Sequence, residues 1–328
     1  MLKGNQVTSS DLQGKRFAID ASHTLMQFLT KKYANSFEIA TDQTQRAIPH
    51  LYGVFYRTIR FLENQILPVY CFDGKSNKLK NRYRNTELSE FIQAQKLHQS
   101  MLNHNLEKHA KSIALSPAYL WKNTIRETKQ LLTSMGVPYL ISPTEGEAQC
   151  AQLVKMGICD FVVSSDFDVL LYGAPLLKVN QIKGKKIVAT LYLASEITKR
   201  YQINRFQLVD LSILIGNDYT LGIKGIGPKK GLDLLQKYNK IENIPNSIRK
   251  NLNLTQSQIQ TIRSLFLLPN VMSKIPDLCL NYPNRGGTLE LMTIDHTLNS
   301  ERVTKGIDRL IKTYNRIKKQ HSQQKLVV

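Results

Sequence analysis

Asp166 and Asp168 stand one residue apart in the otherwise apolar segment FVVSSDFDVLLYG, residues 161–173. Burying a lone carboxylate among apolar side chains is costly unless the carboxylate is paired or binds a metal ion. Other acids of the chain occur in comparable settings, because each follows an apolar run or stands where a helix can begin. These acids are Asp20, Asp73, Glu145, Glu147 and Asp218. The seven residues are therefore the first candidates for a common site.

Crowding seven carboxylates in one place would raise their pKa values and oppose their ionisation. Divalent cations remove this difficulty, since carboxylate oxygens and water are the ligands that Mg²⁺ and Mn²⁺ prefer. Two such ions, about 4 Å apart, can bind a phosphodiester, activate the attacking water and stabilise the leaving oxygen. The residue types thus predict two Mg²⁺ ions, which Mn²⁺ could replace, at a site that hydrolyses phosphodiesters.

Each acid also has a local explanation, as a cap or as part of a turn. The local roles are Glu147 in a capping box with Thr144, Asp20, Asp166 or Asp168 as a helix cap, and Asp218 in a turn with Asn217. For any one acid both explanations stay open. Seven acids at the ends of strands or helices, in a chain of opposite net charge, favour metal binding.

A second motif, GIKGIGPKKGLDLL, covers residues 222–235. Its glycines permit a tight turn with exposed backbone N–H groups, and Pro228 suits the first turn of the helix that follows. Exposed amides and a helix N-terminus bind phosphate, and lysines add positive charge. The residues that would contact DNA here are Gly222, Lys224, Gly225, Gly227, Lys229 and Lys230. An ordinary helix–turn–helix corner is the alternative.

The charge balance of the 328-residue chain supports a polyanionic partner. It holds 45 Lys and Arg against 25 Asp and Glu, a formal net charge of +20. Such an excess favours nucleic acid, although a diffuse basic surface without a specific partner is the alternative. No apolar run approaches the length of a membrane span, and the first twenty residues lack the apolar centre of a secretory signal. We expect an intracellular protein without a membrane partner.

The four cysteines indicate neither zinc nor a disulfide framework, because none are in a C-x-x-C spacing. They are Cys71, Cys150, Cys159 and Cys279. We expect them to be buried as small apolar residues.

Short apolar segments alternate with amphipathic ones along the first half of the chain. Strands are expected at 16–20, 67–73, 137–141 and 161–165, and helices at 47–63, 124–135 and 205–215. This alternation predicts an α/β fold whose parallel sheet is covered on both faces. In such sheets, sites form at the carboxyl ends of the strands, where the acids would converge.

The remaining segments are less regular. Residues 75–120 are polar and rich in Gln, Asn and Lys, which predicts a helical insertion over the edge of the sheet, with a solvated charged arm as the alternative. The sequence of residues 250–305 predicts a mixture of helix and loop. The last twenty residues hold six Lys and Arg and no acid, which predicts a flexible tail that can touch phosphate.

Taken together, several segments of the chain resemble the flap endonuclease family of XPG-like, structure-specific 5′ nucleases. The similar segments appear in the same order between about residues 14 and 320. They are FAIDAS, HLYGVFYRTIRFLENQILPVYCFDGK, MGVPYLISPTEGEA, SSDFDVLLYGA and ILIGNDYTLGIKGIGPKKGLDLL. The resemblance implies a PIN-like nuclease core with a mostly parallel central sheet, a helical cap insertion and a helix-two-turn-helix element that holds duplex DNA.

The resemblance also implies roles for single residues. Asp20, Asp73, Glu145 and Glu147 would surround one Mg²⁺, and Asp166, Asp168 and Asp218 would hold the second. Lys80 would help to place the scissile phosphate, with Arg84 one turn later as the second basic residue of the gateway. Arg57 would contact DNA, and K⁺ could bind at the hairpin 222–231.

The expected domains are a nuclease core over 1–250, a C-terminal helical segment over 251–320 and a flexible tail over 321–328. The core would include the gateway and cap over 75–125 and the helix-two-turn-helix over 216–240. We expect a monomer, placed in the nucleus if the source is eukaryotic and in the cytoplasm if it is archaeal. The end QQKLVV has Gln323-x-x-Leu326 but no paired aromatics, so a standard sliding-clamp motif is not evident and such a partner stays open.

The function expected from this reading is a Mg²⁺-dependent 5′ flap endonuclease, with 5′ exonuclease activity, acting in DNA replication and repair. Two alternatives stay open. One is a sibling nuclease that prefers gaps, 5′ ends or junctions, and the other is a DNA-structure-binding protein with weak catalysis or none.

Overall fold

The computed structural model describes residues 3–30, 39–75, 88–184 and 186–324. Within these residues the strands form one seven-stranded sheet in the order β1-β7-β6-β5-β2-β3-β4. The strands are β1 (Asn5–Thr8), β2 (Arg16–Asp20), β3 (Leu67–Phe72), β4 (Tyr139–Ile141), β5 (Phe161–Val163), β6 (Leu176–Lys183) and β7 (Lys186–Tyr192). The five strands from β6 to β4 run parallel, and β7 and β1 add an antiparallel edge.

Both faces of the sheet are buried, and alternate residues of each central strand belong to different cores. In β2, Phe17 and Ile19 join one hydrophobic core, whereas Ala18 joins the other. In β3, Tyr70 packs with the first group and Cys71 with the second. This division follows from the two-residue repeat of a strand, and it explains why these strands read as continuous apolar runs.

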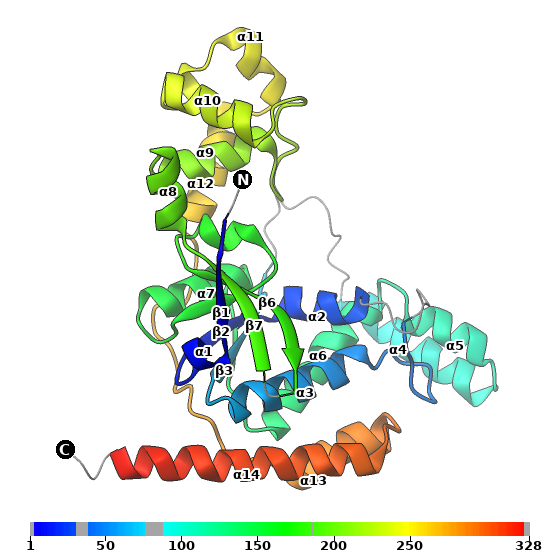
Figure 1. The fold of residues 1–328 in the computed structure, drawn as a ribbon. Coiled ribbons are helices and arrows are strands. Elements are labelled where there is room, and N and C mark those ends of the chain that lie inside the picture. Colours follow the sequence, from blue (N-terminus) through cyan, green and yellow to red (C-terminus); the bar gives the residue numbers. More distant parts are fainter. Residues whose placement is uncertain (1–2, 31–38, 76–87, 185, 325–328) are drawn as a thin grey trace.

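The first core lies between the sheet and α2 (Ala21–Thr30), α3 (Pro49–Glu63), α6 (Leu120–Ser134) and α14 (Ser300–Gln324). The second lies between the sheet and α7 (Gly146–Lys155), α9 (Arg205–Ile215), α10 (Pro228–Tyr238) and α12 (Gln256–Leu267). In Figure 1, α9, α10 and α11 (Asn246–Arg249) rise above the sheet and α14 crosses below it. The remaining α-helices are α1 (Ser9–Leu12), α4 (Leu88–Asn103), α5 (Glu107–Ala114), α8 (Ala194–Tyr201) and α13 (Arg285–Leu289). The 3₁₀ segments are η1 (Phe167–Leu170), η2 (Ile241–Asn243) and η3 (Lys250–Leu252), and η4 (Glu290–Asp295) is a π-helix.

The predicted α/β class is confirmed, and so are the strands at 16–20, 67–73, 137–141 and 161–165, to within two residues. The antiparallel edge of β1, β6 and β7 was not predicted. β1 has four residues and no buried side chain, and a register shift between Val179 and Gln181 breaks the pairing of β6 with β7. Such short or irregular strands carry little hydrophobic periodicity.

The helical insertion is present as α4 and α5, which extend to the right of the sheet in Figure 1. Residues 76–87, which the prediction included, lie outside the described residues. The prediction of a flexible tail over the last twenty residues is wrong for residues 309–324, because α14 continues to Gln324. Arg309 holds this helix to α3, with its guanidinium 2.8 and 2.9 Å from the two carboxylate oxygens of Glu63.

Cys71, Cys150 and Cys159 are buried, as predicted. Cys279 is exposed, so its predicted burial is wrong. Among the helices that the structure describes, none combines the length and apolar character that crossing a membrane would need.

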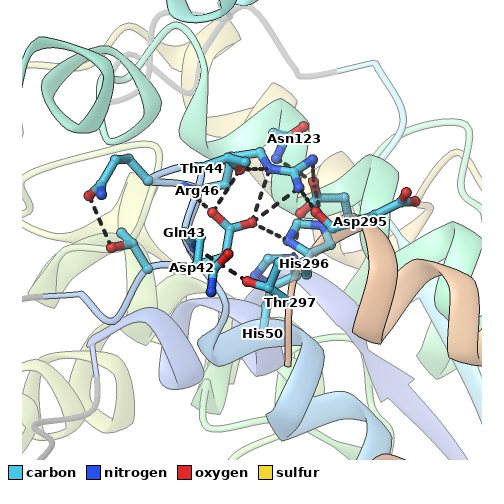
Figure 2. A network of polar contacts seen from close by, with 12 residues as sticks. Asp42, Gln43, Thr44, Arg46, His50, Asn123, Asp295, His296 and Thr297 are labelled. Atoms are coloured by element: carbon cyan, nitrogen blue, oxygen red, sulfur yellow. Dashed lines mark hydrogen bonds and ion pairs between the residues drawn. The ribbon is translucent and has the colours of Figure 1, made fainter. Parts of the chain in front are cut away.

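A buried polar network joins the loop before α3 to α6 and to the segment after η4 (Figure 2). His296 lies between two acids, with Nδ1 2.8 Å from Asp42 Oδ2 and Nε2 3.0 Å from Glu127 Oε1. His50 Nε2 is 3.0 Å from the other oxygen of Glu127, and Arg46 Nη2 is 3.1 Å from Asp42 Oδ2. We call these five residues the Asp42–Glu127 network. Each of its acids is matched by cationic or hydrogen-bonding partners from the chain itself.

Candidate metal centre

The carboxyl ends of four neighbouring strands meet at one edge of the sheet, because β5, β2, β3 and β4 are adjacent and parallel. Six of the predicted acids lie at this edge: Asp20 at the end of β2, Asp73 after β3, Glu145 and Glu147 after β4, and Asp166 and Asp168 after β5. The strand order thus brings together residues that are far apart in the sequence.

Asp20 is the most deeply placed of these acids, with 1% of its surface exposed. Ser164 Oγ donates to Asp20 Oδ2 at 2.9 Å, and the backbone N–H of His23 donates to Oδ1 at 3.1 Å. The second bond closes the first turn of α2, so the predicted capping role is confirmed. Burial raises the pKa of Asp20; His23 opposes this rise, and the negative charge of Asp73 adds to it.

Asp73 is held by donors from two other segments. The backbone N–H of Gly146 donates to Oδ1 at 2.6 Å, and Ser22 Oγ donates to Oδ2 at 2.5 Å. A Cβ at position 146 would lie 2.8 Å from the carbonyl oxygen of Cys71 and 3.0 Å from Asp73 Oδ1. Glycine is therefore required where α7 begins against the end of β3.

The start of α7 places Glu147 toward the end of β2. The capping box predicted for Thr144 and Glu147 is not formed, because Thr144 Oγ1 donates to the carbonyl of Asn270 at 2.9 Å and the N-cap residue is Glu145. Glu147 Oε1 instead lies 3.9 Å from His23 Nε2. Glu147 therefore lies beside His23 and does not form the predicted capping box.

Asp166 has both a local and a shared role. Its Oδ1 accepts from the backbone N–H of Asp168 at 2.9 Å, which caps η1 as predicted. Its other oxygen, Oδ2, lies 3.4 Å from His23 Nε2. Capping therefore uses one carboxylate oxygen and leaves the second directed at the cluster.

The pKa of Tyr172 indicates which of the remaining acids lie near its ring. Burial raises the pKa of Tyr172 well above its usual value, and the charges of Glu147, Tyr219, Glu145 and Asp168 add to the rise. The carboxylates of Glu147, Glu145 and Asp168 are thus each near enough to Tyr172 to affect its pKa.

Asp218 differs from the other acids in its setting. It is exposed and follows α9 rather than a strand. The predicted turn with Asn217 is confirmed, since the N–H of Tyr219 donates to Asn217 Oδ1 at 2.9 Å. The Tyr219 ring packs edge-on against Phe266, whose ring centroid is also 5.2 Å from that of Tyr172. The residue next to Asp218 is thus linked to Tyr172 through aromatic contacts.

His23 was missed by the sequence analysis. The atoms that Asp20, His23 and Glu147 can offer to a metal lie within 4.8 Å of one another. The sequence could have indicated His23, because residues three positions apart lie on the same face of a helix and Asp20 caps the helix that carries His23. Ser22 and Ser164, which hold Asp73 and Asp20, were missed as well.

The residues present fit divalent cations. Oxygen donors dominate the cluster, and a deeply buried carboxylate lies beside a second one that further raises its pKa. A cation would relieve this repulsion and favour the ionised forms. The assignment of single ligands to single ions stays a prediction.

The glycine-rich segment after Asp218 forms the predicted turn into α10, with Pro228 at its first position. Gly222 and Gly225 have φ values of +68° and +83°, which glycine adopts without strain. Ile223 is buried and anchors the turn in the second core. The exposed residues are Lys224, Gly225, Gly227, Lys229 and Lys230, and a Cβ at Gly225 or Gly227 would meet no atom within 4 Å. The turn presents an open, positively charged surface.

The other basic candidates lie elsewhere. Arg57 lies on α3 and is half-buried against α2, with its guanidinium 4.6 Å from the centre of the Phe28 ring. Burial lowers the pKa of Arg57. Lys80 and Arg84 lie outside the described residues. The roles of all three stay predictions.

Comparison with known proteins places this geometry in a family. The family model described as XPG N-terminal domain matches residues 2–94, and the one described as XPG I-region matches residues 136–218. The chain is 36% identical to Flap endonuclease 1 of Saccharolobus solfataricus over 335 residues, covering 95% of this chain and 93% of that protein. It is 34% identical to Flap endonuclease 1 of Homo sapiens over 308 residues, covering 92% and 80%.

The solved structure of flap endonuclease-1 from Methanococcus jannaschii is similar in fold. It superposes with a TM-score of 0.75 at 28% identity, covering 96% of this chain and 98% of that one. Relatives of this identity across nearly the whole chain, together with both XPG models, establish that the chain belongs to the flap endonuclease family of nucleases.

Proposed function

We propose that this protein is a Mg²⁺-dependent endonuclease that cuts DNA where a single strand meets a duplex, releasing a 5′ flap. The observation that carries the proposal is the gathering of carboxylates at the ends of four adjacent parallel strands. The basic surface of the hairpin 222–231 and the net charge of +20 support a DNA substrate.

The proposed ligands of one ion are Asp20, Asp73, Glu145 and Glu147, and those of the second are Asp166, Asp168 and Asp218. Bound divalent ions would supply an activated water and stabilise the oxygen that leaves the phosphodiester. The chain contributes fixed positions for the ligands. Ser164 and the His23 N–H orient the carboxylate of Asp20, and Gly146 and Ser22 orient that of Asp73.

The hairpin 222–231 would hold the duplex through its phosphates. Lys224, Lys229 and Lys230 are exposed, so they can contact the DNA backbone without reading its sequence. A K⁺ ion at this turn would add to that contact. The insertion that contains α4 and α5 would cover the single strand, with Lys80 and Arg84 near the scissile phosphate. We further propose that the protein acts as a monomer, that Mn²⁺ replaces Mg²⁺, and that any sliding-clamp partner binds without a standard motif.

Cleavage of labelled DNA tests the proposal. A double-flap substrate with Mg²⁺ should be cut faster than a blunt duplex or a four-way junction. Faster cutting of either of the latter would instead identify a sibling nuclease with another preference.

The variant Asp168→Ala tests the assigned site. We expect lost cleavage with retained DNA binding, measured by fluorescence anisotropy. The matched control is Asp308→Ala, because Asp308 is an exposed acid on α14 that pairs with Arg285. Equal cleavage by Asp168→Ala and the wild type would refute the assignment.

A further inference from the structure

His23 occupies the centre of the acid cluster. It is the third residue of α2, and the helix begins directly after Asp20 at the end of β2. Its imidazole is therefore carried by the element whose first turn Asp20 caps. Its side chain is 36% exposed, so it is accessible from the site.

The two ring nitrogens face different groups. Nε2 lies 3.4 Å from Asp166 Oδ2 and 3.9 Å from Glu147 Oε1. Nδ1 lies 3.4 Å from the hydroxyls of Ser164 and Ser165 and 3.9 Å from Asp20 Oδ2. Hydroxyl and carboxylate groups beside one nitrogen are the usual way in which proteins orient a metal-binding histidine for coordination through the other.

The distance from Nε2 to Asp166 suits a shared ion better than a direct hydrogen bond. Strong charge-assisted hydrogen bonds between nitrogen and oxygen measure about 2.7–2.9 Å. Two ligands that each lie about 2.1 Å from one cation are roughly 3.0 Å apart at an octahedral angle and roughly 3.4 Å apart at a tetrahedral one. The distance from Nε2 to Asp166 Oδ2 is 3.4 Å, whereas that to Glu147 Oε1 is longer, at 3.9 Å.

We propose that His23 Nε2 is a ligand of the metal centre and makes it a mixed nitrogen–oxygen site. Both Mg²⁺ and Mn²⁺ bind oxygen donors, but an imidazole ligand adds more to the affinity for a first-row transition ion such as Mn²⁺ than to the affinity for Mg²⁺. The inference rests on the proposed metal-dependent nuclease function and specifies a nitrogen ligand of its site.

Pulsed electron paramagnetic resonance of the full chain loaded with Mn²⁺ tests the coordination directly. A bound imidazole couples its ¹⁴N nucleus to the electron spin of the ion. We expect this coupling in the wild type, and its replacement by a ¹⁵N coupling when the protein is labelled with ¹⁵N-histidine. Mn²⁺ bound without any nitrogen coupling would overturn the proposal. This measurement needs no variant and does not depend on cleavage.

The variant His23→Asn tests this difference between the two ions. We expect the Kd for Mn²⁺ to rise about tenfold or more, since even groups that only orient metal ligands contribute that much. The Kd for Mg²⁺ should change much less. The matched control, His109→Asn, alters an exposed histidine of α5 and should keep both the ¹⁴N coupling and the Mn²⁺ affinity. Equal losses for both ions, or a coupling that persists in His23→Asn, would contradict the assignment.

Circular dichroism would show whether His23→Asn folds, and the labelled wild type decides the question if it does not. The two experiments distinguish a wrong role for His23 from a wrong proposed function. Absence of nitrogen coupling in a protein that still cuts flaps removes only the role of His23. Cleavage by Asp168→Ala removes the function on which the inference rests.

Discussion

The protein contains two groups of acids in different surroundings. In the Asp42–Glu127 network, His296, His50 and Arg46 surround the buried carboxylates at about hydrogen-bonding distance (Figure 2). At the proposed metal centre, Asp20 is buried and Asp73 is exposed; hydroxyls and backbone N–H groups donate to these two carboxylates, and His23 lies beside Asp166.

The pKa shifts show the same contrast. Although burial opposes it, hydrogen bonds from His296 and His50 lower the pKa of Glu127 far below its usual value. Burial raises the pKa of Asp20, and its neighbours do not reverse the shift. Hydrogen bonds from the chain thus outweigh burial at Glu127 but not at Asp20, where a bound cation would favour the ionised form.

A third group of acids resembles the network in its ion pairs. Arg263 is buried in α12 and forms ion pairs with Asp210 at 2.6 Å and with Glu242 at 2.5 Å. Hydrogen bonding to Arg263 lowers the pKa of Glu242 to about 2, whereas burial raises the pKa of Asp210 although Arg263 opposes the rise. An ion pair within the chain thus accompanies both of these acids, even where burial raises a pKa as it does at Asp20.

The largest effect is expected from Asp20→Asn. Cleavage should fall by about a thousandfold or more, or about 4 kcal/mol at the transition state, because a proposed metal ligand loses its charge. The free energy of unfolding should stay the same or rise, since the buried charge is removed while the carbonyl can still accept from Ser164. Single-turnover cleavage and urea unfolding measure the two quantities. A destabilised variant with normal cleavage would place Asp20 among the structural acids.

The opposite pattern is expected from Glu127→Gln. Removing one charge from a paired, buried group should lower the free energy of unfolding by about 3 kcal/mol. Cleavage per folded molecule should be retained, because Glu127 lies outside the metal centre. The control is Glu301→Gln, whose carboxylate is 75% exposed in α14 and should change stability little. An unchanged free energy of unfolding in Glu127→Gln would show that the network does not contribute to stability.

The pH dependence of stability sharpens the comparison further. Burial alone would lower the pKa of His296, but its hydrogen bonds to Asp42 and Glu127 raise it above the usual 6.5. A raised pKa in the folded state gives stability that is fully present below pH 6.5 and is lost as the pH rises through the raised value. Compared with His296→Asn, the wild type should lose part of its stability advantage over that interval. Urea unfolding from pH 5.5 to 9 tests this, and a constant difference would contradict it.

The smallest effect concerns the hairpin. The double variant Lys229→Ala, Lys230→Ala should weaken DNA binding uniformly across sequences and reduce its salt dependence by about one unit of slope per lysine. Cleavage at saturating substrate should stay near normal, because these side chains do not touch the acid cluster. Anisotropy titrations at several salt concentrations measure the slope. An unchanged slope would remove the hairpin from the DNA contacts.

The sequence by itself determined the central strands, the turn at 222–227 and the acids that follow the strands. These features are local, because each depends on residue types within a few positions of one another. Examples are the alternation of a strand, a glycine with positive φ and a Pro at the start of a helix. The acids could be placed at one edge because the carboxyl ends of parallel strands must share it.

The tertiary structure alone decided which acids are neutralised by the chain and where His23 is directed. His296 and Asp42 are 254 positions apart, and Ser164 and Asp20 are 144 apart, so no local pattern links the partners. The edge strands were likewise settled by pairing, since β1 meets β7 although it buries no side chain. The energy of a buried charge depends on the groups that surround it in space, and folding brings those groups together from distant parts of the chain.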